Sequence, residues 1–190
     1  MTQTAEELFK KEATELKEKV AFKIREVINS KLPSELSRML RDMCILSGSS
    51  IASIYHGEDP KDYDLWSAVD LQVPSIRDCI LANPVFICEA SSDKYTAQQF
   101  GIDTNEKLIT PNAITMVGKI QFITLGDYNF CRKSFDYVHC LPYYDIRNNK
   151  FSISPQQLYA IKHKKLIKTG YNEPKTWRTE KFKSRGWTLA

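Results

Sequence analysis

Two aspartates separated by one residue, Asp62 and Asp64, most constrain what this chain can fold into. They open an apolar stretch, Tyr63 to Val69, that is typical of a β-strand. Residues i and i+2 of a strand point to the same face, so the two carboxylates are expected to lie side by side. Carboxylates this close repel each other unless a proton or a cation lies between them. The pair therefore predicts a site for Mg²⁺ or Mn²⁺, a hard cation that binds protein carboxylates together with substrate phosphates.

A turn of small residues, Gly48-Ser49-Ser50, lies upstream of the two aspartates. It follows a predicted buried strand, Cys44 to Leu46, and precedes a predicted helix, Ser50 to His56. Free backbone N–H groups at a helix start bind phosphate. A phosphate-binding turn and a pair of metal-binding carboxylates are the minimal equipment for nucleotidyl transfer.

The segment Gly57-Glu58-Asp59-Pro60-Lys61-Asp62-Tyr63-Asp64 adds a recognisable spacing. With the Gly48 turn before it, it resembles the signature of the DNA-polymerase-β-like nucleotidyltransferase superfamily. It is most similar to the head domain of tRNA nucleotidyltransferases (CCA-adding enzymes) and bacterial poly(A) polymerases, in which a glycine turn begins a helix and a Gly-x-x-Pro-x-Asp-x-Asp segment follows. The resemblance extends from Leu46 to Trp66.

The resemblance implies an α/β (α+β) fold: a small mixed β-sheet with flanking helices, like the polymerase-β palm, preceded by a helical N-terminal segment. It implies transfer of a nucleoside monophosphate from a nucleoside triphosphate to an RNA or protein hydroxyl. Asp62 and Asp64 would bind Mg²⁺ or Mn²⁺ and be catalytic. The nucleotide-binding residues would be Gly48, Ser49, Ser50 and Lys61. Tail-adding enzymes need further helical domains, so a compact member of the phage or toxin type is expected.

Further along, the pattern departs from that of the tail-adding enzymes. Asp136-Tyr137 matches an Asp-Phe pair of those enzymes, but Ser134 and Phe135 stand where they have two arginines. The candidate strand that would carry a third carboxylate offers Gln121 instead. Asp136 is therefore predicted as the third catalytic residue, with a helix cap as the alternative reading.

The C-terminal part of the chain is strongly basic, although the whole chain has a net charge of only +4. From residue 161 to 190, nine lysines and arginines stand against two glutamates, with Tyr171, Trp177, Phe182 and Trp187 between them. Lysine, arginine and stacking aromatics together predict an RNA-binding surface over Lys162 to Arg185. The alternative is a basic helical face whose aromatics pack on the core.

Two rival functions follow from these features. The chain could be a nucleotidyltransferase fold without catalysis that serves as a structural or interaction module, for example of a virus. Gln121 and the missing arginines favour this reading. It could instead be a nucleic-acid-binding protein that acts through its basic end. The two adjacent, mutually repelling aspartates favour the enzyme.

Length and composition fit a single domain of 190 residues with a real core, since 42% of the residues are apolar. Within it we expect a helical N-terminal segment (1–45), a nucleotidyltransferase-like core (46–153) and a basic helical segment (154–190). No run is apolar enough for a membrane span, and the charged N-terminus is not a secretory signal. Five cysteines without a Cys-x-x-Cys pair favour reduced thiols and a cytoplasmic location.

Hydrophobic periodicity predicts the remaining elements. Helices are expected over 4–30, from Pro33, over 74–82 and 127–134, from the Ser154-Pro155 start to Gly170, and over 177–185. Strands are expected over 85–88, 142–146 and 151–153, with a hairpin of 113–117 and 119–125 and a loop-rich stretch over 90–106.

Overall fold

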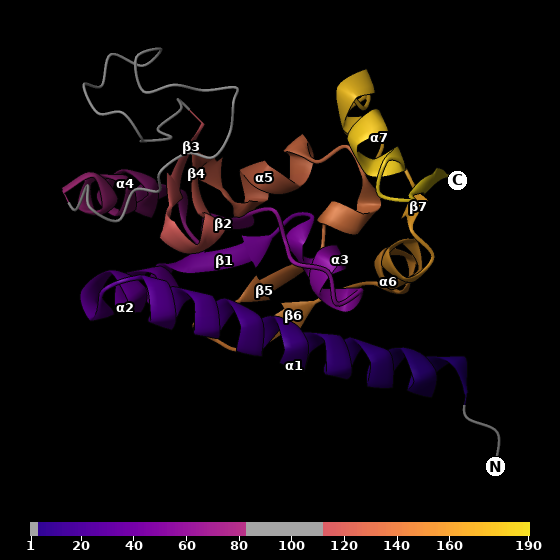
Figure 1. Ribbon diagram of the computed structural model, residues 1–190, viewed down its shortest axis with the longest axis horizontal. Helices are drawn as coiled ribbons and strands as arrows, with labels where there is room; N and C mark the ends of the chain where they lie inside the picture. The colour runs from indigo at the N-terminus through magenta and orange to yellow at the C-terminus, as the bar shows by residue number, and fades with distance from the viewer. Residues whose placement is uncertain (1–3, 83–111) are drawn as a thin grey trace.

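A computed structural model describes residues 4–82 and 112–190 (Figure 1). The predicted strand at 85–88 and the loop-rich stretch at 90–106 lie outside the described residues. A six-stranded sheet forms the centre, in the order β3-β4-β2-β1-β5-β6. Strands β2 and β4 pair in parallel and the other neighbours pair antiparallel, so the sheet is mixed, as expected. The strands are β1 (Cys44–Ser47), β2 (Tyr63–Ser67), β3 (Ala113–Met116), β4 (Ile120–Asp127), β5 (Tyr143–Asp145) and β6 (Lys150–Ser152).

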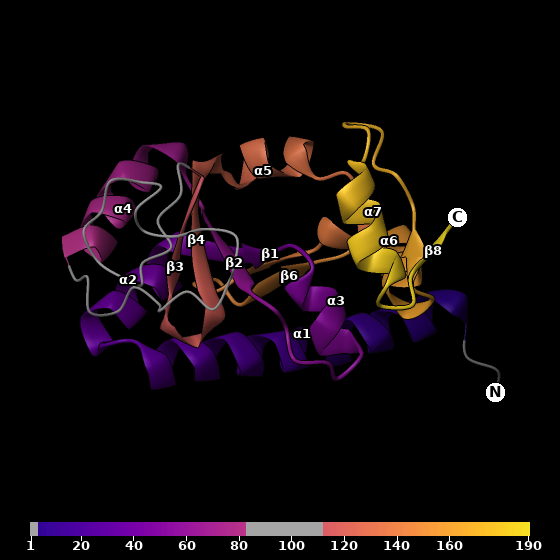
Figure 2. The ribbon, with the colours of Figure 1, turned by 45° about the horizontal axis from the view of Figure 1, so that its top comes forward.

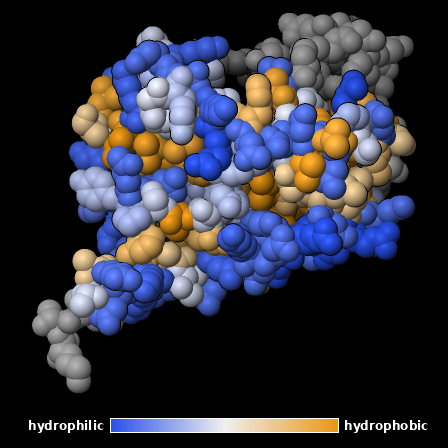
Figure 3. Space-filling model, turned by 180° about the vertical axis from the view of Figure 1, so that it is seen from behind, coloured by the Kyte–Doolittle hydropathy of each residue, from blue (hydrophilic) through white to orange (hydrophobic). Residues whose placement is uncertain are grey.

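The longest helix, α1 (Ala5–Lys31), packs one apolar stripe on the domain. Its buried residues recur at helical spacing and are Leu16, Val20, Ile24 and Ile28. Thr4 begins the helix with a capping box, in which its hydroxyl accepts from the N–H of Glu7. The helix runs along one side of the sheet, and α5 and α7 lie on the other side (Figures 1 and 2). Its outward surface, along the lower edge of Figure 3, is mainly hydrophilic.

The other helices near the sheet form where the sequence predicts them. They are α2 (Ser34–Met43), α3 (Ser50–Tyr55), α4 (Val73–Ala82) and α5 (Tyr128–Ser134), with single 3₁₀ turns at Asp70–Gln72, Val117–Lys119 and Val138–Cys140. The predicted hairpin at Val117-Gly118-Lys119 is confirmed, because Gly118 and Lys119 both take positive φ there. No helix in the described part of the chain is long and apolar enough to cross a membrane.

The C-terminal segment differs from the prediction. Helix α6 (Pro155–Lys162) begins at the predicted Ser154 capping box but ends eight residues before Gly170. Lys164 then takes a positive φ of 48°, and strand β7 (Lys165–Leu166) pairs in parallel with β8 (Thr188–Leu189). The N–H of Val138 also donates to the carbonyl of Ile167, so backbone pairing with distant segments replaces the helix. Helix α7 (Thr176–Lys183) occupies the place of the predicted last helix.

An aromatic cluster holds α7 and the C-terminus against the rest of the domain. The His139 ring is fully buried, with its centroid 4.0 Å from that of Trp187 and 4.6 Å from that of Phe182. Tyr137 stacks on the other side, and its hydroxyl shares a hydrogen bond with Thr179 of α7. Neither ring nitrogen of His139 has a hydrogen-bond partner among the described residues. Burial, and then the charge of Arg178, lower the pKa of His139 to about 3, so the ring is neutral.

The His139→Phe variant should remove an acid sensitivity of the fold. Between pH 6.5 and about 3 the unfolded chain protonates His139 and the folded protein does not. The free energy of unfolding therefore falls as the pH falls, by up to about 1.4 kcal/mol for each pH unit in that window. Urea unfolding at about pH 7 and about pH 5 measures this loss. The variant should show less of it than the parent, whereas His163→Gln, at an exposed histidine, should behave like the parent. Equal acid sensitivity in His139→Phe would contradict this account.

Candidate functional site

The turn after β1 is built around a close approach between Gly48 and Asp64. Gly48 takes a φ of +100°, and a Cβ added there would lie 2.7 Å from Asp64 Oδ2. Only glycine tolerates both that backbone conformation and that contact. The turn is fixed from the other side, because the N–H of Gly48 donates to the Cys140 carbonyl and the Ser47 hydroxyl donates to the Pro142 carbonyl. The prediction that the Gly48 N–H is free for phosphate is therefore wrong.

Strand β2 brings Asp62, Asp64 and Trp66 to one cleft, while Tyr63 and Leu65 are buried on the opposite face. The expected alternation of the strand is thus confirmed. The cleft has a volume of about 640 Å³ and is also lined by Gly48 and Ser49.

Across the parallel pair of strands, Gln121 of β4 lies opposite Asp64, and its side-chain amide donates to the Thr115 hydroxyl. Gln121 lines the same cleft. An amide thus stands beside the carboxylate pair, on the strand where the resemblance to the nucleotidyltransferases would place a third carboxylate.

Asp64 lies in an environment that disfavours its negative charge. Loss of hydration on burial is the main cause, and repulsion from Asp62 adds to it, so the pKa of Asp64 rises to about 8. Lys181 and Arg178 act in the opposite direction. A carboxylate in this state gains from a cation placed beside it, because the cation removes the repulsion that burial has made costly.

The two carboxylates, Asp62 and Asp64, fit Mg²⁺ or Mn²⁺ better than a metal whose ligands all come from the protein. Among the described residues no three or more His, Cys, Asp or Glu side chains come together as a metal cluster. Mg²⁺ does not require one, since it typically takes one or two carboxylates and completes its shell with water and substrate phosphates. Asp62 and Asp64 are the residues that would hold it.

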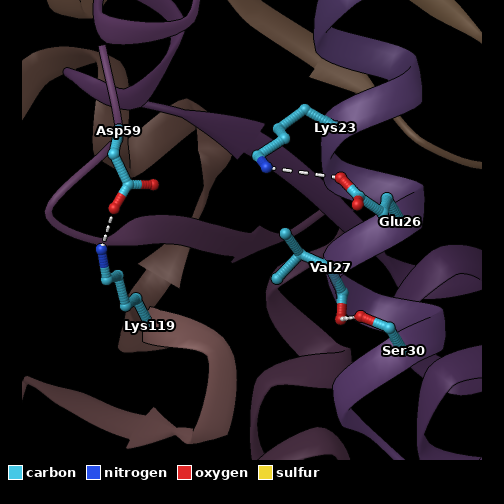
Figure 4. Close-up of polar contacts among 6 residues, drawn as sticks. All are labelled: Lys23, Glu26, Val27, Ser30, Asp59 and Lys119. Atoms are coloured by element: carbon cyan, nitrogen blue, oxygen red, sulfur yellow. Dashed lines mark hydrogen bonds and ion pairs between the residues drawn. The ribbon is translucent and has the colours of Figure 1, made fainter.

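The loop before Asp62 is tied to two other parts of the fold. Lys119, in the β3–β4 turn, forms an ion pair with Asp59 (Figure 4) and donates to the Pro60 carbonyl. On the other side, Lys164 forms an ion pair of 2.7 Å with Glu58. These contacts hold the loop that delivers the aspartates to the cleft.

The remaining predicted residues lie in different environments. Ser50 is buried, and neither Ser50 nor the exposed Lys61 lines the cleft. Asp136 does line it, but its carboxylate is 7% exposed and pairs with Arg178, Oδ2 to Nε, at 2.9 Å. The contact lacks hydrogen-bond alignment and is an ion pair only. The alternative reading, in which Asp136 caps a helix, is wrong, because the 3₁₀ turn that follows begins at Tyr137 without a side-chain cap.

Sequence analysis missed the residues that α7 contributes to the cleft, namely Trp177, Arg178, Lys181 and Phe182. They belong to the basic stretch predicted as an RNA surface. Four lysines of that stretch form ion pairs with acidic side chains, namely Lys162, Lys164, Lys168 and Lys183. Two of its four aromatics, Phe182 and Trp187, are buried, as the alternative reading of this stretch expected. The aromatic residues between the basic ones were the one sign in the sequence that this segment packs against the core.

Replacing Gly48 by alanine should damage the carboxylate pair as well as the fold. The positive φ alone is expected to cost about 1–3 kcal/mol, and the new Cβ must displace the Asp64 carboxylate. We expect lower stability in urea unfolding and weaker Mn²⁺ binding in calorimetry. Gly57→Ala is the matched control, because Gly57 has a φ of +67° with nothing within 4 Å of the added Cβ. It should lose stability but keep its Mn²⁺ affinity, and equal Mn²⁺ affinities in both variants would refute the role given to Gly48.

A second prediction concerns the pair that seats α7. Arg178→Leu leaves the Asp136 carboxylate buried and unpaired, which should lower the free energy of unfolding by about 2 kcal/mol. Asp136→Asn in the same chain should restore part of this loss, because it removes the unpaired charge. The exposed Lys183–Glu180 pair on the same helix provides the control, and Lys183→Gln should cost no more than about 0.5 kcal/mol. A double variant as unstable as the sum of the two single variants would show that the pair does not seat α7.

Comparison with solved structures shows a related fold. The chain is similar to the Thermotoga maritima CCA-adding enzyme complexed with tRNA, with a TM-score of 0.50 and 10% identity over 87% of this chain and 42% of that one. An apo-form CCA-adding enzyme also matches, with a TM-score of 0.42 and 7% identity over 85% of this chain and 44% of that one. The chain thus spans less than half the length of either enzyme. At this identity the likeness shows the fold, which agrees with the nucleotidyltransferase-type fold expected from the sequence.

A comparison with curated proteins gave no match. A family model does match, over residues 16–164, and its description is Gabija anti-defense 2 family protein. That range extends from α1 through the sheet to the end of α6 and includes both cleft aspartates. The match covers well over half of the chain, and the chain belongs to the Gabija anti-defense 2 family.

Proposed function

We propose that this protein is a Mg²⁺- or Mn²⁺-dependent nucleotidyltransferase that moves a nucleoside monophosphate from a nucleoside triphosphate to a hydroxyl group of RNA or protein. The observation that carries the proposal is the pairing of Asp62 and Asp64 in a cleft, against the glycine turn at Gly48. The nucleotidyltransferase-type fold supports it.

In this proposal Asp62 and Asp64 hold the metal, which supplies positive charge to the reacting phosphate group and the leaving pyrophosphate. Ser49, which follows Gly48 and lines the cleft, would contact the polyphosphate of the nucleoside triphosphate. Transfer at phosphorus proceeds in line, so the attacking hydroxyl and the leaving pyrophosphate lie on opposite sides of the transferred group. The acceptor would then approach from the side of Gln121 and Trp66, which line the same cleft.

Asp136, predicted as a third catalytic carboxylate, receives a different role in the proposal. Its ion pair with Arg178 supports a positioning role, in which it fixes the helix that closes one side of the cleft. Gln121 cannot take up a proton from the acceptor, so Asp62 and Asp64 carry the acid–base and metal chemistry.

The description of the family supports a proposal about the acceptor. An anti-defense role against Gabija fits an enzyme that modifies a component of that defense, and we propose that the acceptor hydroxyl belongs to such a component. Nucleotidylation would add a charged, bulky group to the acceptor, which is a direct way to block a binding or catalytic surface.

The alternative is a nucleotidyltransferase fold that has lost catalysis and acts as an interaction module. Gln121 opposite Asp64 is the observation that favours it. The two closely spaced aspartates count against it, because their mutual repulsion disfavours the charge of Asp64 and a bound cation would relieve it.

Label transfer tests the proposal. Each nucleoside triphosphate, labelled at the α-phosphate, is incubated with the protein and Mg²⁺ or Mn²⁺, and with mixed RNA, with a cell lysate, or with purified Gabija components. We expect labelled acceptor with the parent chain. The double variant Asp62→Asn/Asp64→Asn should give none, because it removes the metal ligands. The fold should survive this change, because the variant also removes the repulsion between the two carboxylates.

Asp78→Asn, at an exposed aspartate of α4, serves as the matched control and should label normally. Absence of label together with absence of metal-dependent nucleotide binding would favour the inactive module. Label that persists in the double variant would exclude Asp62 and Asp64 as the metal site.

A further inference from the structure

Helix α7 presents two cations to the cleft that Asp62 and Asp64 also line. Arg178 and Lys181 are three residues apart and lie on one face of the helix, and both line the cleft. Lys183 pairs with Glu180 and does not line the cleft. The helix therefore has a cleft side and an outer side, each with its own basic residues.

Of the three basic side chains of α7, Lys181 is the one without an ion pair or a hydrogen bond to another side chain among the residues the structure describes. It is nevertheless partly buried, which lowers its pKa, and the negative charge of Asp62 opposes this shift. The ammonium group and the carboxylates thus influence each other across the cleft without closing to an ion pair.

The space between them suits a polyphosphate chain. A metal held by Asp62 and Asp64 would supply positive charge to phosphate oxygens in the cleft. The Lys181 ammonium group, which lines the same cleft, would supply a second positive charge to the same polyphosphate. Lysine is suited to this position, because its ammonium group acts as a compact point charge on a long stem.

Contacts with the rest of the domain hold helix α7 in place, and they therefore position Lys181. Arg178 pairs with Asp136, the Tyr137 hydroxyl bonds to Thr179, and Phe182 is buried against His139. These contacts hold α7 on both sides of Lys181, at Arg178 and Thr179 before it and at Phe182 after it. Helix α7 lies outside the range 16–164 that the family model matches, so the family match does not assign this contribution.

We propose that Lys181 binds the β- and γ-phosphates of the nucleoside triphosphate from α7, facing the metal site at Asp62 and Asp64. The inference rests on the proposed function and names the residue that distinguishes a triphosphate from a monophosphate in the same cleft. Arg178 supports it by seating the helix through Asp136.

Calorimetry with Mg²⁺ and inorganic tripolyphosphate tests the inference without a choice of base. Lys181→Gln should weaken tripolyphosphate binding about tenfold or more, because it removes a charge-assisted contact to phosphate. Binding of adenosine monophosphate and of Mn²⁺ should change less than about twofold, since neither involves the β- and γ-phosphates. Lys183→Gln, at the Lys183–Glu180 pair, should bind tripolyphosphate like the parent. Lys181→Arg should retain most of the affinity.

The outcomes separate this inference from the proposed function. If the parent chain transfers label from a nucleoside triphosphate and Lys181→Gln binds tripolyphosphate as tightly as the parent, the lysine assignment is wrong and the enzyme assignment stands. If the parent neither transfers label nor binds tripolyphosphate, both are wrong. If Lys181→Gln loses thermal stability and affinity for all three ligands equally, Lys181 is a structural neutraliser of Asp62 and Asp64, and the inference is overturned.

Discussion

The close approach of the Gly48 turn to the Asp64 carboxylate is the contact on which the cleft depends. It joins the end of β1 to β2, and it can form only because residue 48 has no side chain and takes a positive φ. The same turn is bonded to the carbonyl of Cys140, so the segment that precedes β5 is fixed by it as well. The site therefore does not lie on an exposed loop. It lies where three segments of the sheet region are locked together, and small displacements of any one of them would move the carboxylate.

Holding Asp64 in this place disfavours its negative charge, and residues far away in the sequence offset part of that effect. Burying Asp64 beside Asp62 raises its pKa, and the cations that oppose this shift, Lys181 and Arg178, come from the last part of the chain. The C-terminal segment is brought there by backbone pairing of β7 with β8 and by the burial of Phe182 and Trp187 around His139. The aromatic cluster and the acidic pair are thus parts of one arrangement. Without the cluster α7 has no fixed place, and without α7 the cleft loses Arg178 and Lys181, the two cations that oppose the pKa shift of Asp64.

The local elements near the site followed from the sequence because their signals are local. The helix of α1, the hairpin around Gly118 and the alternation of β2 each depend on periodicity or on turn residues within a short window, and each was predicted. The helix expected from Pro155 to Gly170 was not found beyond Lys162, because the residues after it pair with strand β8 and with Val138. Such pairing is long-range and leaves no periodic trace. The Gly48 N–H was predicted to be free for a similar reason, since its acceptor, Cys140, is distant in sequence.

The cleft residues also differ in whether a local sequence pattern could identify them. Asp62 and Asp64 were identified because they stand at strand spacing after the Gly48 turn and the Gly57–Pro60 loop, whereas Lys181 was one of many lysines in a basic stretch. The basic residues and the aromatics between them suggested an RNA-binding surface there. In the fold, four of those lysines are neutralised by acidic partners, and three basic residues of the stretch, Lys175, Arg178 and Lys181, line the cleft. The basic charge of the stretch is therefore not one continuous surface, because part of it lies in surface ion pairs and part of it lines the cleft. The part that lines the cleft suits a small anion, of the size of a polyphosphate, and shares the cleft with Asp62 and Asp64.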